Sequence, residues 1–167
     1  MELQEAKYKF IQSWGTFGSQ WGINKTMAQI HALLMIASEA LSVEDIMEQL
    51  SISRGNASMN LRALMDWGIV YKEYKSGERK EYFTAEKDLD ELAVKIARER
   101  SKREIKPALK VLKEVSAIDA GTTAEGKHFV EQTSKLYDFV LRADNMVDKV
   151  TELNDNWLGR LVMKIMR

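Results

Sequence analysis

The chain of 167 residues contains no cysteine, which excludes disulfide bonds, thiolate catalysis and zinc or iron–sulfur sites held by cysteine. It also lacks an apolar run close to the roughly 20 residues that a membrane span requires. The polar, acidic N-terminal string MELQEAKYK does not have the pattern of a signal peptide. We therefore expect a cytoplasmic protein of one or two small domains, without membrane contact and large enough to bury a core.

Groups that bind metals or carry out catalysis are scarce. His31 and His128 are the only histidines and fall in separate segments, and His31 lies beside an apolar stripe, which is typical of a packed side chain. Asp144 and Asp148 share a helix face, but solvated faces give this pattern routinely and no calcium-loop motif accompanies them. No nucleophile–base pair or nucleotide-binding loop stands out. We therefore expect no enzyme activity, no cofactor and no metal.

A surplus of charge of one sign is missing as well. Basic and acidic residues number 25 each, so the formal net charge is zero, which does not favour nucleic-acid binding. Locally the balance is uneven: residues 71–80 carry four basic and two acidic side chains, and residues 95–113 carry eight basic and two acidic ones. Residues 42–83 as a whole have a net charge of −1. Basic surface is therefore expected in patches.

Residues 42–83 are typical of a helix-turn-helix followed by a β-hairpin wing. The two predicted helices are SVEDIMEQL and RGNASMNLRALMDWG, with SIS as the turn between them. The strands IVYKEY and RKEYFT flank the turn Ser76-Gly77-Glu78, and the short string ALS at 40–42 is a candidate third strand. The predicted fold class is mainly α, with a winged helix-turn-helix domain and a small β wing.

Capping residues set the limits of these two helices. Ser42 with Asp45 forms a weak capping box for the first helix, and Ser53 can cap the second. Gly68 follows the second helix, where a residue in the left-handed conformation commonly ends a helix.

The second helix of the motif has an apolar side and a polar side. At 100° per residue, Ala57, Leu61 and Leu64 form the core side. The first turns of such a helix reach base edges in the major groove, so double-stranded DNA is the expected partner. Arg62 suits a guanine and Asn56 an adenine, each through two hydrogen bonds. The predicted base contacts are Asn56, Ser58, Met59 and Arg62, the predicted phosphate contacts are Ser53 and Arg54, and the predicted wing contacts are Lys72, Lys75, Arg79 and Lys80.

A winged helix that binds another protein, without specific DNA binding, is the alternative interpretation. The neutral charge of the motif favours it, and the four basic residues on or beside the wing argue against it.

Helices are also predicted before the motif. Residues 2–21 repeat large apolar side chains three, four or seven residues apart, namely Leu3, Phe10, Trp14, Phe17 and Trp21. Thr26 can cap a second helix over 27–39, whose buried stripe would be Ile30, Leu33, Leu34 and Ala37.

After residue 86 the chain is predicted to be nearly all helical, with a kink or division at Pro107. Thr122 with Glu125 forms a capping box for a long final helix. Two seven-residue registers run along that helix and suit packing against another helix, from this chain or a second subunit. They are Phe129, Leu136, Ala143, Val150 and Trp157 in one, and Thr133, Val140, Val147, Asn154 and Leu161 in the other. The expected organisation is a dimerisation helix over 1–25, a DNA-binding domain over 26–85 and a helical dimerisation region over 86–167.

The strings WGINKTMAQIHALL, SRGNASMNLRALMDWG and GERKEYF resemble the GbsR branch of the MarR-like transcription regulators over about residues 10–115. The resemblance implies a cytoplasmic homodimer in which the N- and C-terminal helices form the interface. It further implies that two winged domains bind a pseudo-palindromic operator, most often as a repressor. Named members govern choline and glycine-betaine genes. Since aromatic cages bind quaternary ammonium groups, a small-molecule effector such as choline would use Trp14, Phe17, Trp21 and Trp67, where the first helix meets the winged domain.

Overall fold

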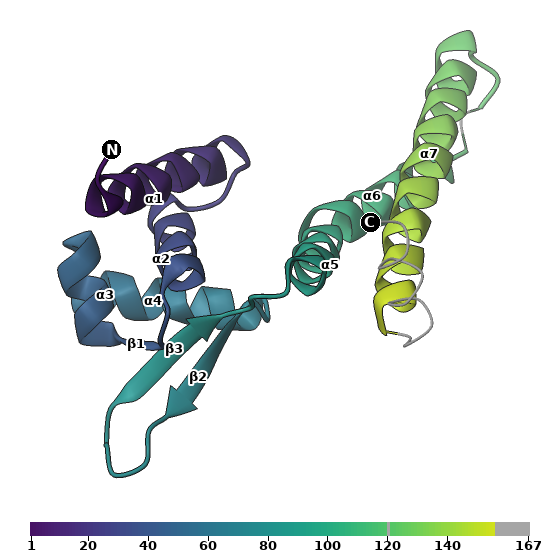
Figure 1. The fold of residues 1–167 in the computed structure, drawn as a ribbon. Helices are drawn as coiled ribbons and strands as arrows, with labels where there is room; N and C mark the ends of the chain where they lie inside the picture. The colour runs from purple at the N-terminus through teal and green to yellow at the C-terminus, as the bar shows by residue number, and fades with distance from the viewer. Residues whose placement is uncertain (120, 156–167) are drawn as a thin grey trace. The chain divides into compact units, whose positions relative to one another are not determined.

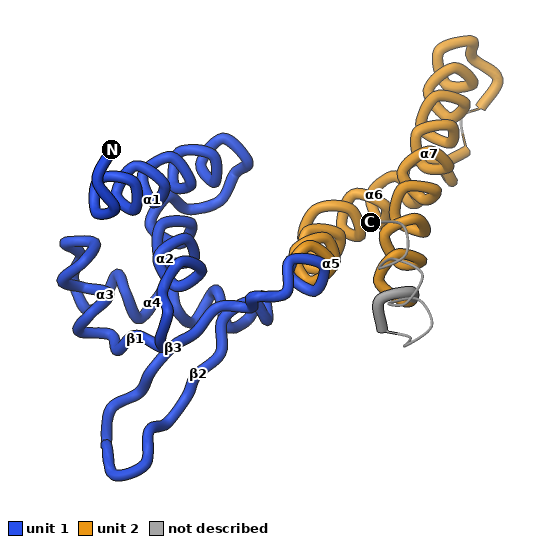
Figure 2. Tube along the Cα trace, viewed as in Figure 1, with its two compact units in different colours: residues 1–92 blue, residues 93–167 orange. Residues whose placement is uncertain are grey.

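A computed structural model describes residues 1–119 and 121–155 of the chain. It divides into two compact units, residues 1–92 and residues 93–167 (Figure 2). Trp157 and Leu161 of the predicted repeat lie outside the described residues.

The first unit is a winged helix-turn-helix (Figure 1), which confirms the predicted fold class. A three-stranded antiparallel sheet has the order β1-β3-β2, with Leu41 opposite Phe83 and Val70 opposite Ala85. The expected strand at 40–42 is therefore present and pairs with the wing. The elements in chain order are α1 (Leu3–Gln20), α2 (Lys25–Ile36), β1 (Leu41–Ser42), α3 (Val43–Leu50), α4 (Arg54–Asp66), β2 (Val70–Tyr74) and β3 (Glu81–Ala85).

Local capping explains where the two motif helices begin and end. Ser42 and Asp45 form the predicted capping box: the Asp45 amide donates to the Ser42 hydroxyl at 3.2 Å, and the Ser42 amide donates to the Asp45 carboxylate at 2.8 Å. The Ser53 hydroxyl accepts from the Asn56 amide at 3.3 Å, as predicted. Gly68 has a φ of 70°, which confirms its role after α4.

Two of the predicted caps are wrong by one or two residues. Asn24, rather than Thr26, caps α2, because its side-chain oxygen accepts from the Met27 amide at 3.1 Å. Thr123, rather than Thr122, accepts from the Gly126 amide at 3.1 Å in the first turn of the last helix. In both cases a neighbouring residue has a side chain with equivalent capping chemistry, so the sequence alone does not separate them.

The core of the first unit is built around α2. Ile30 and Leu34 of α2, Ile46 of α3, Leu61 and Leu64 of α4 and Val70 of β2 are almost completely buried. Burial of one such aliphatic side chain contributes roughly 1.5–3 kcal/mol. The predicted stripe on α2 is confirmed for Ile30, Leu33 and Leu34, but the helix ends at Ile36 instead of residue 39, so Ala37 lies beyond it and is half-buried.

Lys87, just after β3, closes the C-terminal end of α2. Its ammonium donates to the carbonyl oxygens of Leu34, Met35 and Ala37 at 2.7, 2.7 and 3.0 Å. A cation there satisfies carbonyls that have no partner within the helix. The chain that leaves the wing is thereby fixed to the central helix.

Helix α1 packs against α2 through small residues, and its large aromatic side chains are exposed. Ile11, Gly15 and Gly18 are its buried positions. A Cβ atom built at Gly18 would lie 2.5 Å from the Cβ of Ala28, so the two helices approach too closely for a side chain there. The apolar residues that defined this helix in the sequence therefore do not face the core.

The second unit holds most of α5 (Leu89–Arg100), which begins in the first unit, and the helices that follow it. A π-helical turn, η1 (Ser101–Ile105), leads into α6 (Lys106–Ser116) and then α7 (Ala124–Asp155). The helix is divided at this turn, with Pro107 in the first turn of α6, where a proline costs no hydrogen bond. Ser101 and Asp144, both buried, are hydrogen-bonded to each other and join η1 to α7.

The two predicted registers on α7 differ in how far their side chains are exposed. Thr133, Val140 and Val147 are half-buried, on the side where Asp144 and Asp148 meet Ser101 and Lys106. In the other register Phe129, Leu136 and Val150 are exposed and Ala143 is half-buried, and Phe139 and Met146 are exposed as well. Among the described side chains of α7, the register of Thr133, Val140 and Val147 is therefore the more buried of the two.

Candidate nucleic-acid interface

Helix α4 has the two sides that its sequence predicts. Ala57, Leu61 and Leu64 are 0–1% exposed. Met59 is 57% exposed, and Arg62 is exposed as well. Asn56 and Ser58 are half-buried on the flanks. Since α4 is anchored along one side, its outer side is a rigid surface of mixed polarity that a groove can receive.

Arg62 is the cation on the outer side of α4. Its guanidinium Nε donates to the Ser58 carbonyl oxygen at 3.3 Å, which holds the side chain along the helix. Arg62, Ser58 and Lys72 also line one cleft of about 170 Å³ between α4 and the sheet. The structure thus brings together side chains that are up to 14 residues apart in the sequence.

Arg54, a predicted phosphate contact, forms an ion pair with Glu44 of α3. The hydrogen bond from Arg54 lowers the pKa of the Glu44 carboxyl group. Both side chains are well exposed, and exposed ion pairs are weak. A phosphate can therefore replace Glu44 at Arg54 at little cost.

The basic side chains of the wing differ in how they are held. Lys75 places its ammonium 4.3 Å from the centre of the Tyr82 ring, and the Tyr82 hydroxyl donates to the Glu78 carboxylate. That hydrogen bond raises the pKa of Tyr82. Arg79 and Lys80 are exposed beside the turn. Lys72, by contrast, is paired with Glu81 at 2.8 Å, so its charge is partly neutralised before any ligand arrives.

The predicted aromatic cage does not lie where the first helix meets the winged domain. Trp14, Phe17 and Trp21 are 38%, 50% and 64% exposed, whereas the junction with α2 is made by Gly15 and Gly18. Trp67 is half-buried at the end of α4. The expected location is therefore wrong, because the helices pack through glycine, and the ligand-binding role of these aromatic residues stays a prediction.

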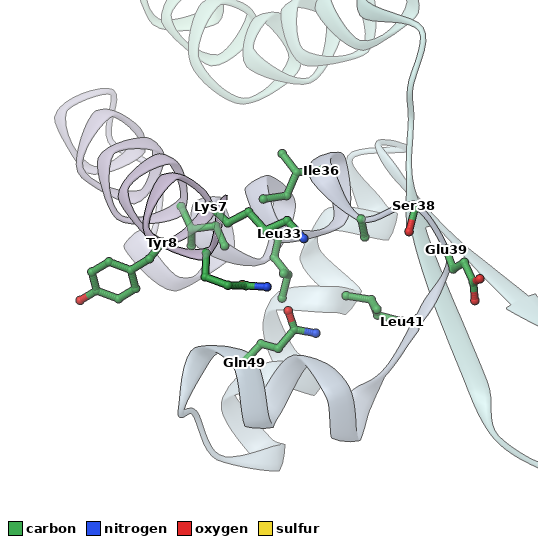
Figure 3. A pocket seen from close by; sticks show the side chains of 11 residues that line it. Lys7, Tyr8, Leu33, Ile36, Ser38, Glu39, Leu41 and Gln49 are labelled. Carbon is green, nitrogen blue, oxygen red and sulfur yellow. The ribbon is translucent and has the colours of Figure 1, made fainter. Parts of the chain in front are cut away.

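A groove of about 500 Å³ lies between α1, the end of α2 and α3 (Figure 3). Its apolar lining includes Ile11 and Leu33, and Lys7 of α1 and Gln49 of α3 line it as well (Figure 3). Nothing in the sequence pattern indicated this groove, because its lining comes from three segments that only the tertiary fold brings together.

Two residues that support the interface were also missed. Asn60 is buried and hydrogen-bonded to Asn56; the spacing of four residues on a helix is the signal that could have revealed this pair. Tyr82 supports Lys75, but its pairing depends on the geometry of the wing turn and has no local sequence signal.

The described residues contain no group of three or more histidine, aspartate or glutamate side chains that could hold a metal ion. Within the same part of the chain, no helix is both long and apolar enough to cross a membrane.

The fold and the arrangement of α3, α4 and wing define the class of the protein as a winged helix-turn-helix. Residues 21–80, from the end of α1 to the wing, match the model of the MarR family. The HTH-type transcriptional repressor GbsR of Bacillus subtilis (strain 168) is 23% identical over 115 residues, which cover 69% of this chain and 63% of that protein. This chain therefore spans less than two thirds of the length of that relative.

A solved structure described as a transcriptional regulator superposes with a TM-score of 0.58 at 16% identity, over 86% of this chain and 99% of that one. At this identity the likeness concerns the fold. Together with the family match, it confirms the resemblance seen in the sequence. The chain is therefore similar to the MarR- and GbsR-like transcription regulators, over residues 21–80 in the family model and over 115 residues in the relative.

Proposed function

We propose that the protein binds double-stranded DNA in a sequence-specific manner, with α4 in the major groove and the wing on the flanking backbone. The observation that carries this proposal is the outer side of α4, where Met59 and Arg62 are exposed on a helix anchored by a buried opposite side. The cations at Lys75, Arg79 and Lys80 are placed on the adjoining wing. Such a protein acts where chromosomal DNA is, so its proposed compartment is the cytoplasm.

The proposed DNA-binding form is a homodimer. On α7, five large apolar side chains are 44–66% exposed and follow one another at steps of seven, three, seven and four residues, as a heptad seam requires: Phe129, Leu136, Phe139, Met146 and Val150. Such a seam is complete only when a second helix covers it, and a second copy of α7 supplies the same surface. Two α4 helices about 34 Å apart would then meet successive major grooves of a pseudo-palindromic site.

The proposed regulatory outcome is repression, since the matched relative carries the name of a repressor. The dimer would occupy its operator and exclude transcription until a small-molecule effector changes the arrangement of the two DNA-binding domains. An effector can do this only if it binds the two arrangements with different affinity.

The groove of Figure 3 is one place for such an effector, because α1, α2 and the motif helix α3 all line it. The exposed aromatic residues of α1 are a second candidate effector site, and their rings suit a quaternary ammonium compound such as choline. Titration with choline should give a saturable change in tryptophan fluorescence. If no change appears up to millimolar concentrations, choline is not the effector.

Fluorescence anisotropy tests the proposed function. The purified protein is titrated onto its own upstream intergenic duplex and onto a scrambled duplex, at several salt concentrations. With about four phosphate contacts per subunit, the slope of log K against log salt should be near −7. Nanomolar, sequence-selective and salt-dependent binding supports the proposal.

A protein-interaction winged helix is the second candidate, and one observation favours it. Arg54 and Lys72 already pair with Glu44 and Glu81, so the cations of the motif are partly neutralised. In that case the same titrations would show weak binding, equal on both duplexes and with little dependence on salt.

A further inference from the structure

A pair of asparagines lies one turn apart at the start of α4. Asn60 is only 3% exposed, and Asn56 is half-buried. The side-chain nitrogen of Asn60 donates to the backbone carbonyl of Asn56 at 2.9 Å and to the side-chain oxygen of Asn56 at 2.7 Å. A residue that belongs to the core side of the helix therefore touches one that is predicted to contact a base.

Chemistry fixes the orientation of both amides. The backbone carbonyl of Asn56 can only accept a hydrogen bond, so the atom of Asn60 that faces it must be the NH₂ group. This NH₂ group can only donate, so the atom of Asn56 that faces it must be the oxygen Oδ1. The NH₂ group of Asn56 is consequently turned away from Asn60, and the described part of the chain provides no acceptor for it.

We propose that Asn60 is a positioning residue that determines the base preference of Asn56. This inference rests on the proposed function, in which α4 enters the major groove. Asn56 presents its NH₂ group as a donor while Oδ1 stays bonded to Asn60. Adenine is recognised by an asparagine that offers oxygen and nitrogen together. Oδ1 has two lone pairs, and Asn60 uses one of them, so Oδ1 can still accept from adenine while the NH₂ group donates to it. The geometry thus fixes which end of the Asn56 amide is oxygen and which is nitrogen, and so favours the adenine contact expected from the sequence.

The test is selection of bound sequences from a library of random duplexes, with the wild-type protein and an Asn60→Leu variant. Leucine fits a buried position, and the Asn56 carbonyl keeps the helical hydrogen bond from the amide of residue 60. The variant should fold, which circular dichroism checks. Without its inner partner, the Asn56 amide can rotate, and its oxygen and nitrogen are no longer held in a fixed order. We expect the preference for adenine at one position per half-site to fall about tenfold.

A double-mutant cycle separates positioning from packing. In an Asn56→Ala background, Asn60→Leu should leave the selected sequence unchanged, because the side chain that it repositions is gone. A change of preference that persists in this background would overturn the inference, and so would an identical motif for wild type and Asn60→Leu. A wild-type protein that enriches no sequence would overturn the proposed function together with this inference.

Discussion

Residues 1–92 bury an apolar core, whereas the described part of residues 93–167 buries mainly polar side chains. In the first unit the buried residues are largely aliphatic and come from α2, α3, α4 and the sheet. In the second, Glu99, Ser101, Asp144 and Thr151 are buried and Val94 is the apolar exception, while α6 buries no side chain. Large apolar residues of α7 are exposed instead. The first unit thus has an apolar core of its own, and the described part of the second exposes large apolar side chains along α7.

The largest expected effect comes from removing a central side chain of the first unit. Ile30 is 0% exposed, and Ile30→Ala should lower the free energy of unfolding by about 2–5 kcal/mol, because it leaves a cavity. The matched variant Ile30→Val removes a single methylene group and should lower it by about 0.5–1.5 kcal/mol. Urea titrations of the three proteins check both values. Equal free energies of unfolding for Ile30→Ala and wild type would contradict the placement of Ile30 in the core.

The second prediction concerns the exposed seam of the second unit. Leu136→Glu combined with Phe139→Glu should weaken the proposed dimer at least about a hundredfold, a loss of about 3 kcal/mol, because carboxylates would be buried between the two copies. Asn145→Glu is the matched control, since Asn145 is exposed on the same helix but outside the seam. Light scattering at several protein concentrations measures the molecular mass of the wild type and of each variant, and so the fraction of dimer. A double variant that keeps the mass of the wild type would show that the seam is not the dimer contact.

The third and smallest effect is a dependence of stability on pH that belongs to the first unit. Burial, with a smaller contribution from the charge of Lys87, lowers the pKa of His31 from its ordinary value of 6.5 to about 4, and its Nε2 atom has no hydrogen-bond partner among the described residues. Between these pH values the unfolded chain binds a proton that the folded one does not. Stability is therefore lost as pH falls from about 6.5 to about 4.

At pH 5.5 this contribution amounts to about 1 kcal/mol relative to pH 7.5. His31→Leu removes it, so the loss between the two pH values should be smaller in the variant by that amount. Urea titrations at both pH values give the comparison, and the carboxylates shared by both proteins cancel in the difference. An identical loss in wild type and variant would show that His31 is not held neutral.

Local chemistry explains why the winged unit could be predicted well. The capping box of Ser42 and Asp45, the cap at Ser53 and the glycine at residue 68 act within a few residues, and the apolar side of α4 follows from helical periodicity alone. Periodicity does not reveal which apolar stripe faces inward. In α1 the glycines allow the closer approach to α2, so the aromatic stripe points out, contrary to a simple interpretation of hydrophobic spacing.

Contacts between distant segments account for what the sequence did not reveal about the site. Glu44 neutralises Arg54 from another helix, and Lys72 is paired with Glu81 of the neighbouring strand. The clamp that Lys87 makes on the last carbonyls of α2 joins residues about 50 positions apart. The sequence spacing of these residues does not predict that they pair, because each contact depends on how the elements of the motif pack together.

The most direct test of the account is to compare Arg62→Ala and Lys75→Ala by anisotropy, each on a selected operator duplex and on a random one. Arg62 lies on the outer side of α4 and Lys75 on the wing. We predict that Arg62→Ala weakens operator binding by about 1–3 kcal/mol and leaves random DNA nearly unaffected, whereas Lys75→Ala weakens both alike. Equal losses for both variants on both duplexes would contradict the assignment of base recognition to α4 and of backbone contact to the wing.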